Sequence, residues 1–275
     1  MFPYVWAIDQ IPVVADLVDS YALNIASRRE RVGPLARHVY DLEYRRVERF
    51  EKEASRHFRQ VLIASAADRD FIGAPNVIVL ANGVDLEAYE FRPDAREPDT
   101  LIFTGNMGYQ PNEDAVTWFS RDVFPTLLAA RPSLRLLIVG ARPSAAVRAL
   151  RASNGIEVTG AVPSVSEYLH RATIAVCPMR CGSGIQNKVL EAMATGTPVV
   201  ATSLANRGVD GMPDRDILIA NTSEEMCRAI LGVLSEPQRG KTMAYAAHRL
   251  VAERFGWDQH AAKLEKIYAE VLHST

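Results

Sequence analysis

The stretch that decides the fold is residues 174–201, IAVCPMRCGSGIQNKVLEAMATGTPVVA. It contains a short apolar run (174–176), a glycine-bearing loop, a segment with helical periodicity (185–195) and a second apolar run (198–201). Short runs rich in β-branched residues are typical of buried parallel strands, and two parallel strands are joined by a right-handed helical crossover. This stretch therefore predicts one strand–helix–strand unit of an α/β sheet.

The same alternation continues on both sides of this stretch. The further apolar runs are residues 101–103, 134–139, 156–158 and 217–219, and the further helical stretches are residues 113–130, 144–152, 165–171 and 223–234. Six strands separated by helices predict a doubly wound parallel α/β sheet with helices on both of its faces.

The sequence before residue 83 predicts a smaller piece of α/β structure. Apolar runs at 12–18, 61–64 and 77–80 are candidate strands, and the apolar spacing between residues 35 and 50 predicts an amphipathic helix. Three parallel strands alone would leave open edges. This piece therefore either packs on the larger domain or lacks its first strands.

The chain ends with two further helical stretches, residues 240–255 and 257–272. Five apolar residues form one stripe on the second, Ala261, Leu264, Ile267, Tyr268 and Val271. Such a stripe predicts a helix that packs on a domain surface.

The segment 28–59 is basic, with ten Arg and Lys residues against six acidic ones. A basic amphipathic helix can lie on an anionic lipid surface. The alternative is a solvated helix face with ion pairs four residues apart, such as Glu48 with Lys52. The sequence leaves both interpretations open.

Composition excludes several classes of protein. The formal net charge of −2 argues against a strongly basic nucleic-acid binder. No apolar run approaches the roughly 18 residues of a membrane span, and the first residues do not resemble a secretory signal. Three cysteines predict a reducing compartment rather than a disulfide framework. We therefore expect a cytoplasmic protein.

Several catalytic signatures are absent from the sequence. It has no HExxH, no GxxxxGK and no GxSxG motif, which disfavours metalloproteases, P-loop NTPases and α/β-hydrolases. Cys177 and Cys181 lie four residues apart without a second pair at zinc spacing, so no metal site is predicted. We expect His170 to be a surface residue at a helix end.

The position of a ligand site follows from the predicted sheet. In open doubly wound sheets, ligands bind at the carboxyl ends of the strands, where the strand order reverses. With the usual order this point lies between the first and fourth strands, next to the loops 104–109 and 178–184. Both loops carry glycines, and the second leads directly into a helix.

The second loop has the features of an anion site. Gly182 and Gly184 permit close backbone approach and positive φ angles. The backbone N–H groups of Ile185, Gln186 and Asn187, together with the helix dipole, would face an anion. A phosphate or diphosphate is the expected ligand.

Three charged residues extend this prediction. Arg180 and Lys188 could add positive charge for the phosphates, and the Glu191 carboxylate, about one turn further on, could accept bonds from two ribose hydroxyls. The alternative is an ordinary glycine loop with a surface Glu. Gly105 and Gly108 give only GxxG, which argues against a nicotinamide dehydrogenase.

These residues carry a resemblance to a known family. Residues 184–200, GIQNKVLEAMATGTPVV, resemble the signature of the glycosyltransferases group 1 (family 4), which are retaining, metal-independent enzymes of the GT-B fold. The run NGVD at 82–85 is similar to their interdomain motif, and FTG at 103–105 and LIVG at 137–140 resemble strands of their nucleotide-binding domain. FGW at 255–257 and the final helix resemble their C-terminal tail.

The resemblance implies a domain division and a function. Residues 1–82 would be a partial acceptor-side Rossmann-like domain, residues 83–255 the donor domain, and residues 256–275 a helix that crosses back to the N-terminal part. A sugar would move with retention from a nucleotide-diphosphate-sugar to a glycan or lipid-linked acceptor in cell-surface polysaccharide synthesis. No metal or cofactor is implied.

The resemblance also implies site residues. Glu191 matches the second Glu of the E-x7-E motif and would hold the ribose hydroxyls, while residues 182–188 would face the diphosphate and the sugar. The implied catalytic residues are Ser183, Lys188 and Glu191. The implied donor-binding residues are Gly105, Asn106, Arg180, Gly182, Gly184, Ile185, Gln186, Asn187, Lys188 and Glu191.

The sequence departs from the family pattern at the site. Ser183 stands at the position of the first Glu, and a hydroxyl cannot stabilise an oxocarbenium-like sugar as a carboxylate can. Asn106 replaces an Arg, and Pro111 and Asn112 stand where a Lys is usual. The candidate replacement cations are Lys188, Arg180 and, more weakly, Arg142. The form GIQNK resembles a subgroup of bacterial exopolysaccharide-type sugar transferases.

The largest departure is at the N-terminus. Residues 15–20 resemble a late strand of the family's N-terminal domain, so we expect about 100 residues to be missing upstream. The open alternatives are therefore a donor-binding subunit that needs a partner chain, and an epimerase or hydrolase of the same fold. Oligomeric state, peripheral contact with the inner membrane and the nucleotide base stay open.

Overall fold

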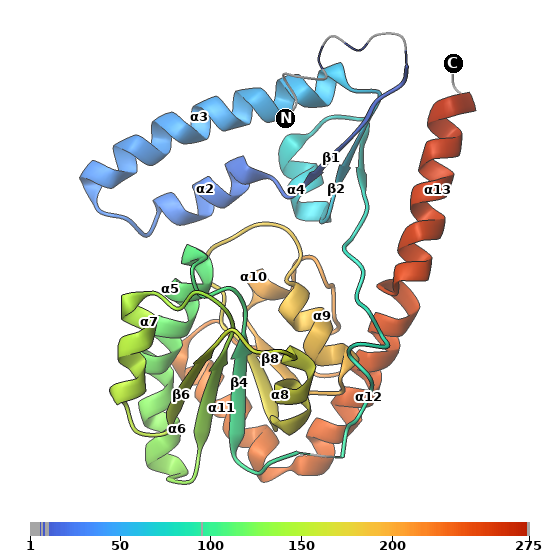
Figure 1. The fold of residues 1–275 in the computed structure, drawn as a ribbon. Coiled ribbons are helices and arrows are strands. Elements are labelled where there is room, and N and C mark those ends of the chain that lie inside the picture. Colours follow the sequence, from blue (N-terminus) through green and yellow to red (C-terminus); the bar gives the residue numbers. More distant parts are fainter. Residues whose placement is uncertain (1–5, 7, 9–10, 95, 274–275) are drawn as a thin grey trace. The chain divides into compact units, whose positions relative to one another are not determined.

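The computed structural model describes residues 6, 8, 11–94 and 96–273 (Figure 1). Backbone contacts divide the chain into two compact units. Unit 1 consists of Met1–Gly83, Cys181–Ile185 and Trp257–Thr275, and unit 2 consists of Val84–Arg180 and Gln186–Gly256. The short segment Cys181–Ile185, which the resemblance assigned to the donor domain, therefore belongs by its contacts to unit 1.

Unit 2 contains a six-stranded parallel sheet in the order β6-β5-β4-β7-β8-β9. Its strands are β4 (Thr100–Thr104), β5 (Arg135–Val139), β6 (Ile156–Gly160), β7 (Ile174–Cys177), β8 (Val199–Ala201) and β9 (Leu218–Ile219). This is the predicted doubly wound order. The strand order reverses between β4 and β7, the first and fourth strands of this sheet, which confirms the predicted switch point.

The helices of unit 2 lie on both faces of this sheet (Figure 1). They are α5 (Gln110–Trp118), α6 (Phe124–Ala130), α7 (Ala145–Ala149), α8 (Val165–Arg171), α9 (Asn187–Ala194), α10 (Ser203–Asn206), α11 (Ser223–Ser235) and α12 (Pro237–Arg254). Hydroxyl side chains cap several of them: Thr222, for example, accepts a bond from Glu225 N, and the Glu225 carboxylate accepts one from Thr222 N.

The predicted helical stretch 113–130 is confirmed, since residues 110–130 are helical throughout, but they do not form one regular α-helix. A π-helical segment, η1 (Phe119–Val123), separates α5 from α6. Pro125 lies in the first turn of α6 and has no N–H to donate, so the regular bonding of a single helix cannot pass through it. The stretch 144–152 likewise divides into α7 and the 3₁₀ turn η2 (Leu150–Ala152).

Unit 1 contains a three-stranded parallel sheet in the order β1-β2-β3. The strands are β1 (Val14–Val18), β2 (Gln60–Ile63) and β3 (Val77–Val79), as the apolar runs predicted. The helices are α2 (Tyr21–Arg29), α3 (Pro34–His57), α4 (Ala66–Ile72) and α13 (Trp257–His273). The sequence predicted α3 and α13 but not the shorter α2 and α4.

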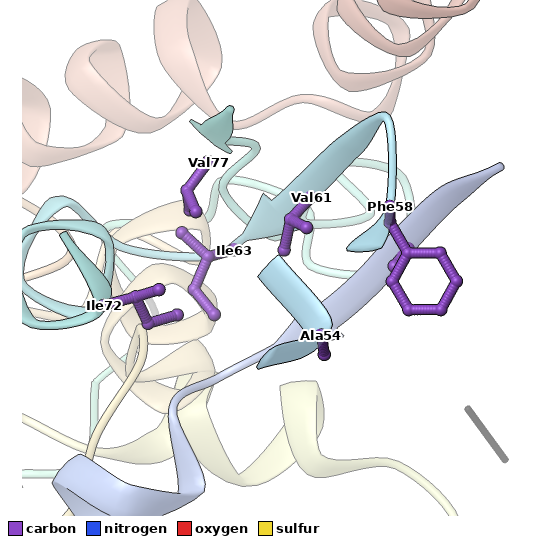
Figure 2. Packing of buried hydrophobic residues seen from close by; sticks show 7 residues of the cluster. Ala54, Phe58, Val61, Ile63, Ile72 and Val77 are labelled. Carbon is purple, nitrogen blue, oxygen red and sulfur yellow. The ribbon is translucent and has the colours of Figure 1, made fainter. Parts of the chain in front are cut away.

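The two faces of this small sheet are covered by different elements. Val61 and Ile63 pack with Ala54, Phe58 and Ile72, from α3, its C-cap and α4 (Figure 2). Because side chains alternate along a strand, Leu62 points to the other face. There it packs with Leu80 and with residues of α13, Ile267 and Val271. Packing of the C-terminal helix on a domain surface is thus confirmed, although Tyr268 of the predicted stripe is 47% exposed.

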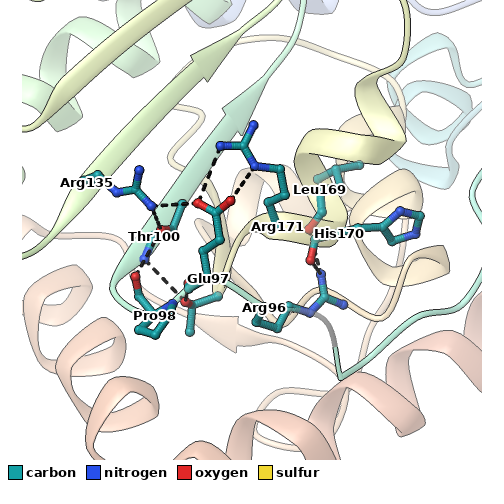
Figure 3. A network of polar contacts seen from close by, with 9 residues as sticks. Arg96, Glu97, Pro98, Thr100, Arg135, Leu169, His170 and Arg171 are labelled. Carbon is teal, nitrogen blue, oxygen red and sulfur yellow. Dashed lines mark hydrogen bonds and ion pairs between the residues drawn. The ribbon is translucent and has the colours of Figure 1, made fainter.

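A network of hydrogen bonds and ion pairs lies at the amino end of the large sheet (Figure 3). Glu97 bridges Arg135 and Arg171, at 2.7 Å from each. Arg96 donates to the carbonyls of Leu169 at 2.6 Å, His170 at 3.1 Å and Thr195 at 3.0 Å, near the C-terminal ends of α8 and α9. This guanidinium therefore adds hydrogen bonds to backbone oxygens at the ends of two helices, where carbonyls lack the full set of intrahelical partners.

The prediction for His170 was wrong. Its side chain is 6% exposed, and Nε2 lies 2.8 Å from the carbonyl oxygen of Glu90. The residue does lie in the last turn of α8, as expected. The chain that enters β4 covers it, and the local sequence pattern around a helix end does not reveal such a distant contact.

Candidate functional site

The site in unit 2 begins where β4 ends. Gly105 follows β4 with φ = 152°, and its N–H donates to Val139 O at 3.1 Å. Gly140 follows β5 with φ = 148°, and a Cβ there would overlap the carbonyl of Gly105. Only glycine permits this approach, so these two residues bring the carboxyl ends of β4 and β5 together without side chains between them.

Lys188, in the first turn of α9, lies beside this glycine. A Cβ placed on Gly105 would be 3.4 Å from Lys188 Cε. The Lys188 ammonium donates to Gln186 Oε1 at 2.9 Å and lies 5.7 Å from the centroid of the Phe103 ring. Both of these partners are uncharged. The ammonium forms no ion pair within 4.0 Å among the described residues, although the Glu191 carboxylate is near enough to interact with its charge. Lys188 therefore brings positive charge to the end of β4, where phosphate oxygens could approach the backbone.

Glu191 lies three residues after Lys188, on the same face of α9. Burial raises the pKa of the Glu191 carboxyl, while the nearby Lys188 charge and a hydrogen bond from the Tyr89 hydroxyl act in the opposite direction. The same burial and the Glu191 charge raise the pKa of the Tyr89 phenol well above its usual range. Tyr89 thus stays protonated and donates, which leaves the remaining lone pairs of Glu191 for a ligand.

Tyr89 was not among the site residues predicted from the sequence. The Asp85 carboxylate accepts bonds from Glu87 N at 3.0 Å and Ala88 N at 2.9 Å, and Tyr89 N donates to Asp85 O at 3.0 Å. Asp85 is the last residue of NGVD, so this motif builds the turn that carries Tyr89. The signal available in the sequence was an aromatic hydroxyl one helical turn after that aspartate.

Comparison with known proteins agrees with this geometry. The family "Glycosyl transferases group 1" matches residues 98–236, about half of the chain. The chain belongs to the group 1 glycosyltransferases. It is similar to the D-inositol 3-phosphate glycosyltransferase of Rhodococcus opacus (32% identical over 228 residues, covering 73% of this chain and 49% of the relative). It is also similar to the phosphatidyl-myo-inositol mannosyltransferase of Mycolicibacterium smegmatis (27% identical, covering 71% and 52%).

Solved structures share the fold of this chain. Sucrose-phosphate synthase from Thermosynechococcus elongatus superposes with a TM-score of 0.75 at 16% identity, covering 95% of this chain and 68% of that one. Anabaena Alr3699/HepE in complex with UDP and glucose gives 0.70 at 15% identity, covering 94% and 71%. The likeness confirms the predicted GT-B class. The chain spans about half the length of the curated relatives it matches.

Arg180, a predicted donor ligand, already has partners within unit 2. Its Nη2 and Nε lie 2.6 and 3.0 Å from the two carboxylate oxygens of Asp114, and its guanidinium lies 5.2 Å from the Trp118 ring centroid. A phosphate would have to share this cation with Asp114. Lys188 is therefore the better-placed of the two candidate cations.

Asn106 and Asn112 stand where the family usually has cations, and both shape the loop after β4. Asn106 Oδ1 accepts a bond from Gly108 N at 3.0 Å, and Asn112 Nδ2 donates to Asn106 O at 3.0 Å. Within the described residues, the buried Asn112 Oδ1 has no hydrogen-bond partner. Arg142, the weaker candidate cation, borders Gly108 and is exposed.

The start of α9 lies two residues later than predicted. The helix begins at Asn187 with Gln186 as its N-cap residue, so Ile185 belongs to the preceding loop. Two of the predicted anion-binding glycines donate inside unit 1: Gly182 N to Ser27 Oγ and Gly184 N to Asp68 Oδ2, each at 2.9 Å. Ser183 Oγ lies 3.5 Å from Asn24 Nδ2.

The described residues contain neither a candidate metal cluster nor a membrane-spanning helix. They contain no group of three or more His, Cys, Asp or Glu side chains able to hold a metal ion. Within the same residues, every helix is too short or too polar to cross a membrane. Among the described residues, Cys177 at the end of β7 and Cys181 are buried and form no disulfide.

Proposed function

We propose that this glycosyltransferase takes its sugar from a nucleotide-diphosphate-sugar and transfers it, with retention, to a glycan or lipid-linked acceptor of a cell-surface polysaccharide. The observation that carries this proposal is the pair Lys188 and Glu191 on one face of α9, beside the bare backbone of Gly105. One residue offers a cation for phosphate oxygens and the other offers acceptor oxygens for a vicinal diol.

The two residues have different roles in this proposal. Glu191, oriented by Tyr89, accepts bonds from the two ribose hydroxyls. Lys188 binds the diphosphate as the bond between the sugar and the phosphate breaks. Because negative charge grows on the diphosphate at that moment, a preorganised cation and backbone N–H groups lower the barrier. No metal and no cofactor is needed in this scheme, and the leaving diphosphate accepts the proton of the acceptor hydroxyl.

Binding experiments on the full chain test this proposal. A thermal-shift screen with UDP, GDP, ADP and TDP identifies the base, since a ligand that binds only the folded state raises its melting temperature. Lys188→Ala is expected to weaken binding of the diphosphate by roughly tenfold or more and to leave the bare nucleoside nearly unaffected. Lys241→Ala is the matched control, because Lys241 pairs with Asp94 instead.

Two results would contradict the assignment. If no nucleoside diphosphate raised the melting temperature, the assignment of a donor site would be contradicted. Equal weakening of nucleoside and diphosphate by Lys188→Ala would show that Lys188 does not contact phosphate. Binding of a nucleotide-sugar without transfer or hydrolysis would favour the alternative of a donor-binding subunit that needs a partner chain or an oligomer.

We also propose a peripheral contact of unit 1 with the cytoplasmic face of an anionic membrane. Leu35, Val39 and Leu42 are 91%, 59% and 46% exposed on α3. Their spacing continues with the exposed residues Arg46 and Arg49, so apolar and cationic side chains share one face of the helix. This combination fits an interface with acidic headgroups. The predicted Glu48–Lys52 ion pair does form, at 2.9 Å, but off this face.

Vesicle co-sedimentation tests this contact. The protein is expected to bind vesicles that contain phosphatidylglycerol and not vesicles of phosphatidylcholine alone. Reversing Arg46 and Arg49 to Glu is expected to abolish binding, whereas Arg228→Glu, at an exposed ion pair of α11, serves as control. Equal binding to both kinds of vesicle would contradict the proposal.

A further inference from the structure

Unit 2 contains a cavity of about 430 Å³ at the amino end of its sheet. Asp99, Thr173 and Pro198, which line it, directly precede β4, β7 and β8, and α11 and α12 supply further lining residues. Helix α9 begins near Lys188 and ends beside Gly196, which also lines the cavity. The cavity therefore lies at the other end of α9 from the proposed donor site, and its volume is in the range that holds small molecules.

Most of the surface of this cavity is apolar. The apolar residues that line it include Pro98, Pro198, Val233, Leu234, Pro237 and Ala244. Val233, Leu234 and Ala244 belong to α11 and α12 and are buried in the protein. A hydrocarbon group placed against them would be removed from water, which favours binding of a ligand with an apolar body.

Five charged side chains also line the cavity, and four of them are paired with one another. Arg131 lies 2.8 Å from Asp99, and Lys241 lies 2.6 Å from Asp94. The fifth, Arg96, forms no ion pair among the described residues. One positive charge is therefore left without a counter-charge at the cavity.

The Arg96 guanidinium is bonded only to uncharged groups (Figure 3). Its Nη2 makes one hydrogen bond, to Thr195 O, and its buried Nε has no partner within the described residues. Burial lowers the pKa of this guanidinium to about 10, so it stays charged at neutral pH although its charge is partly removed from water. A nearby anion would stabilise such a charge.

The charge balance selects the kind of anion. One unpaired guanidinium is matched by one negative charge, and a carboxylate fits a guanidinium well. A phosphate monoester carries nearly two negative charges at neutral pH, and the second would lie near the carboxylates of Asp94 and Asp99 without a cation of its own. The cavity is therefore better suited to a monocarboxylate than to a phosphate.

We propose that this cavity is a further ligand site of unit 2, which binds a small organic monocarboxylate. The carboxylate lies beside Arg96, and the apolar body of the ligand lies against Val233, Leu234 and Ala244. The site is separate from the one proposed for the nucleotide-sugar, because neither Lys188 nor Glu191 lines the cavity.

Calorimetric titration of the full chain with matched probes tests this inference. The probes are 2-naphthoate, its uncharged analogue 2-naphthamide, and 2-naphthyl phosphate. We expect 2-naphthoate to bind about tenfold or more tightly than 2-naphthamide, the range of a charge-assisted hydrogen bond, and more tightly than 2-naphthyl phosphate.

Two variants locate the probe in the cavity. Arg96→Gln is expected to abolish the preference for 2-naphthoate over 2-naphthamide, whereas Arg92→Gln, at an exposed ion pair with Glu90, is the matched control. Because Arg96 also binds backbone carbonyls, the second variant leaves it in place. Ala244→Leu adds three carbons to the lining and is expected to weaken both probes by about tenfold, with the fold checked by circular dichroism.

The opposite results would overturn the inference. They are binding of 2-naphthoate weaker than about 1 mM, equal binding of 2-naphthoate and 2-naphthamide, tighter binding of 2-naphthyl phosphate, and unchanged binding in a folded Ala244→Leu variant. Lys188→Ala is expected to leave 2-naphthoate binding unchanged. Loss of 2-naphthoate binding in that variant would place the probe at the donor site and would also overturn the inference.

Discussion

Glu191 in unit 2 and Asp19 in unit 1 are two partly buried carboxylates with opposite surroundings. Burial raises the pKa of each. Glu191 has a cation, Lys188, and a hydroxyl donor, Tyr89, that favour its charged form. Asp19 has only further acids, Asp68 and Asp16, that oppose it. The comparison shows that burial alone does not define a site residue. The neighbouring charges and hydrogen-bond donors determine whether the ionised carboxylate is stabilised, as in Glu191, or destabilised, as in Asp19.

The largest expected effect is the loss of nucleotide affinity on replacing Glu191, the carboxylate with a nearby cation. Glu191→Ala should weaken binding of the preferred nucleoside diphosphate by about 1–3 kcal/mol, because hydrogen bonds between the ribose and a charged group are lost. Isothermal titration calorimetry measures the change. Glu224→Ala, at an exposed position of α11, is the control. An unchanged affinity would show that Glu191 does not contact the ribose.

Asp19, which has no nearby cation to favour its charged form, should affect the stability of the fold. The folded-state pKa of Asp19 is raised to about 6 from 3.8, so its stabilising contribution is complete below pH 3.8 and is lost as the pH rises through 6. The Asp19→Asn variant does not lose stability in this way, because its amide does not ionise. The variant should therefore gain stability over the wild type between pH 4 and pH 7.5, by roughly 1–3 kcal/mol.

Urea unfolding at the two pH values measures this gain, and comparing variant with wild type removes the contributions of all other titrating groups. A gain of the same size at both pH values would contradict the raised pKa. A loss at pH 7.5 would show that the charge of Asp19 stabilises the fold, and the contrast with Glu191 would disappear.

The smallest expected effect concerns the support of Glu191. Tyr89→Phe removes the hydroxyl that lowers the Glu191 pKa, so that pKa should rise further. Diphosphate affinity should fall by about 0.5–1.5 kcal/mol near neutral pH, and the pH below which binding weakens should move upward. Titrations between pH 5 and pH 8 measure both. An unshifted pH profile would show that Tyr89 does not act through Glu191.

The sequence predicted the parts of the molecule that depend on local pattern. Runs such as 101–103 and 134–139 are apolar because both faces of a parallel sheet are buried, and they located β4 and β5 correctly. The strand order followed from the rules of doubly wound sheets. The spacing of Lys188 and Glu191 placed both on one helix face, as the structure shows.

Contacts between segments that are distant in the chain could not be predicted from the sequence. Tyr89 reaches Glu191 across about a hundred residues of chain, and Asp19 reaches Gly184 across even more. His170 is buried because the carbonyl of Glu90 covers it. The π-helical segment between α5 and α6 lies just before Pro125, and the apolar periodicity of 113–130 does not reveal it.

The Arg96 guanidinium at the amino edge of the large sheet also holds the C-terminal end of α9. This helix has only eight residues, with Lys188 in its first turn and its C-cap residue, Thr195, bonded through its carbonyl to Arg96 at 3.0 Å. Its far end is thus fixed before any nucleotide arrives. Little conformational entropy of the helix is then lost on ligation, and more of the contact energy appears as affinity. Loosening Arg96 would make donor binding weaker without touching a single donor contact.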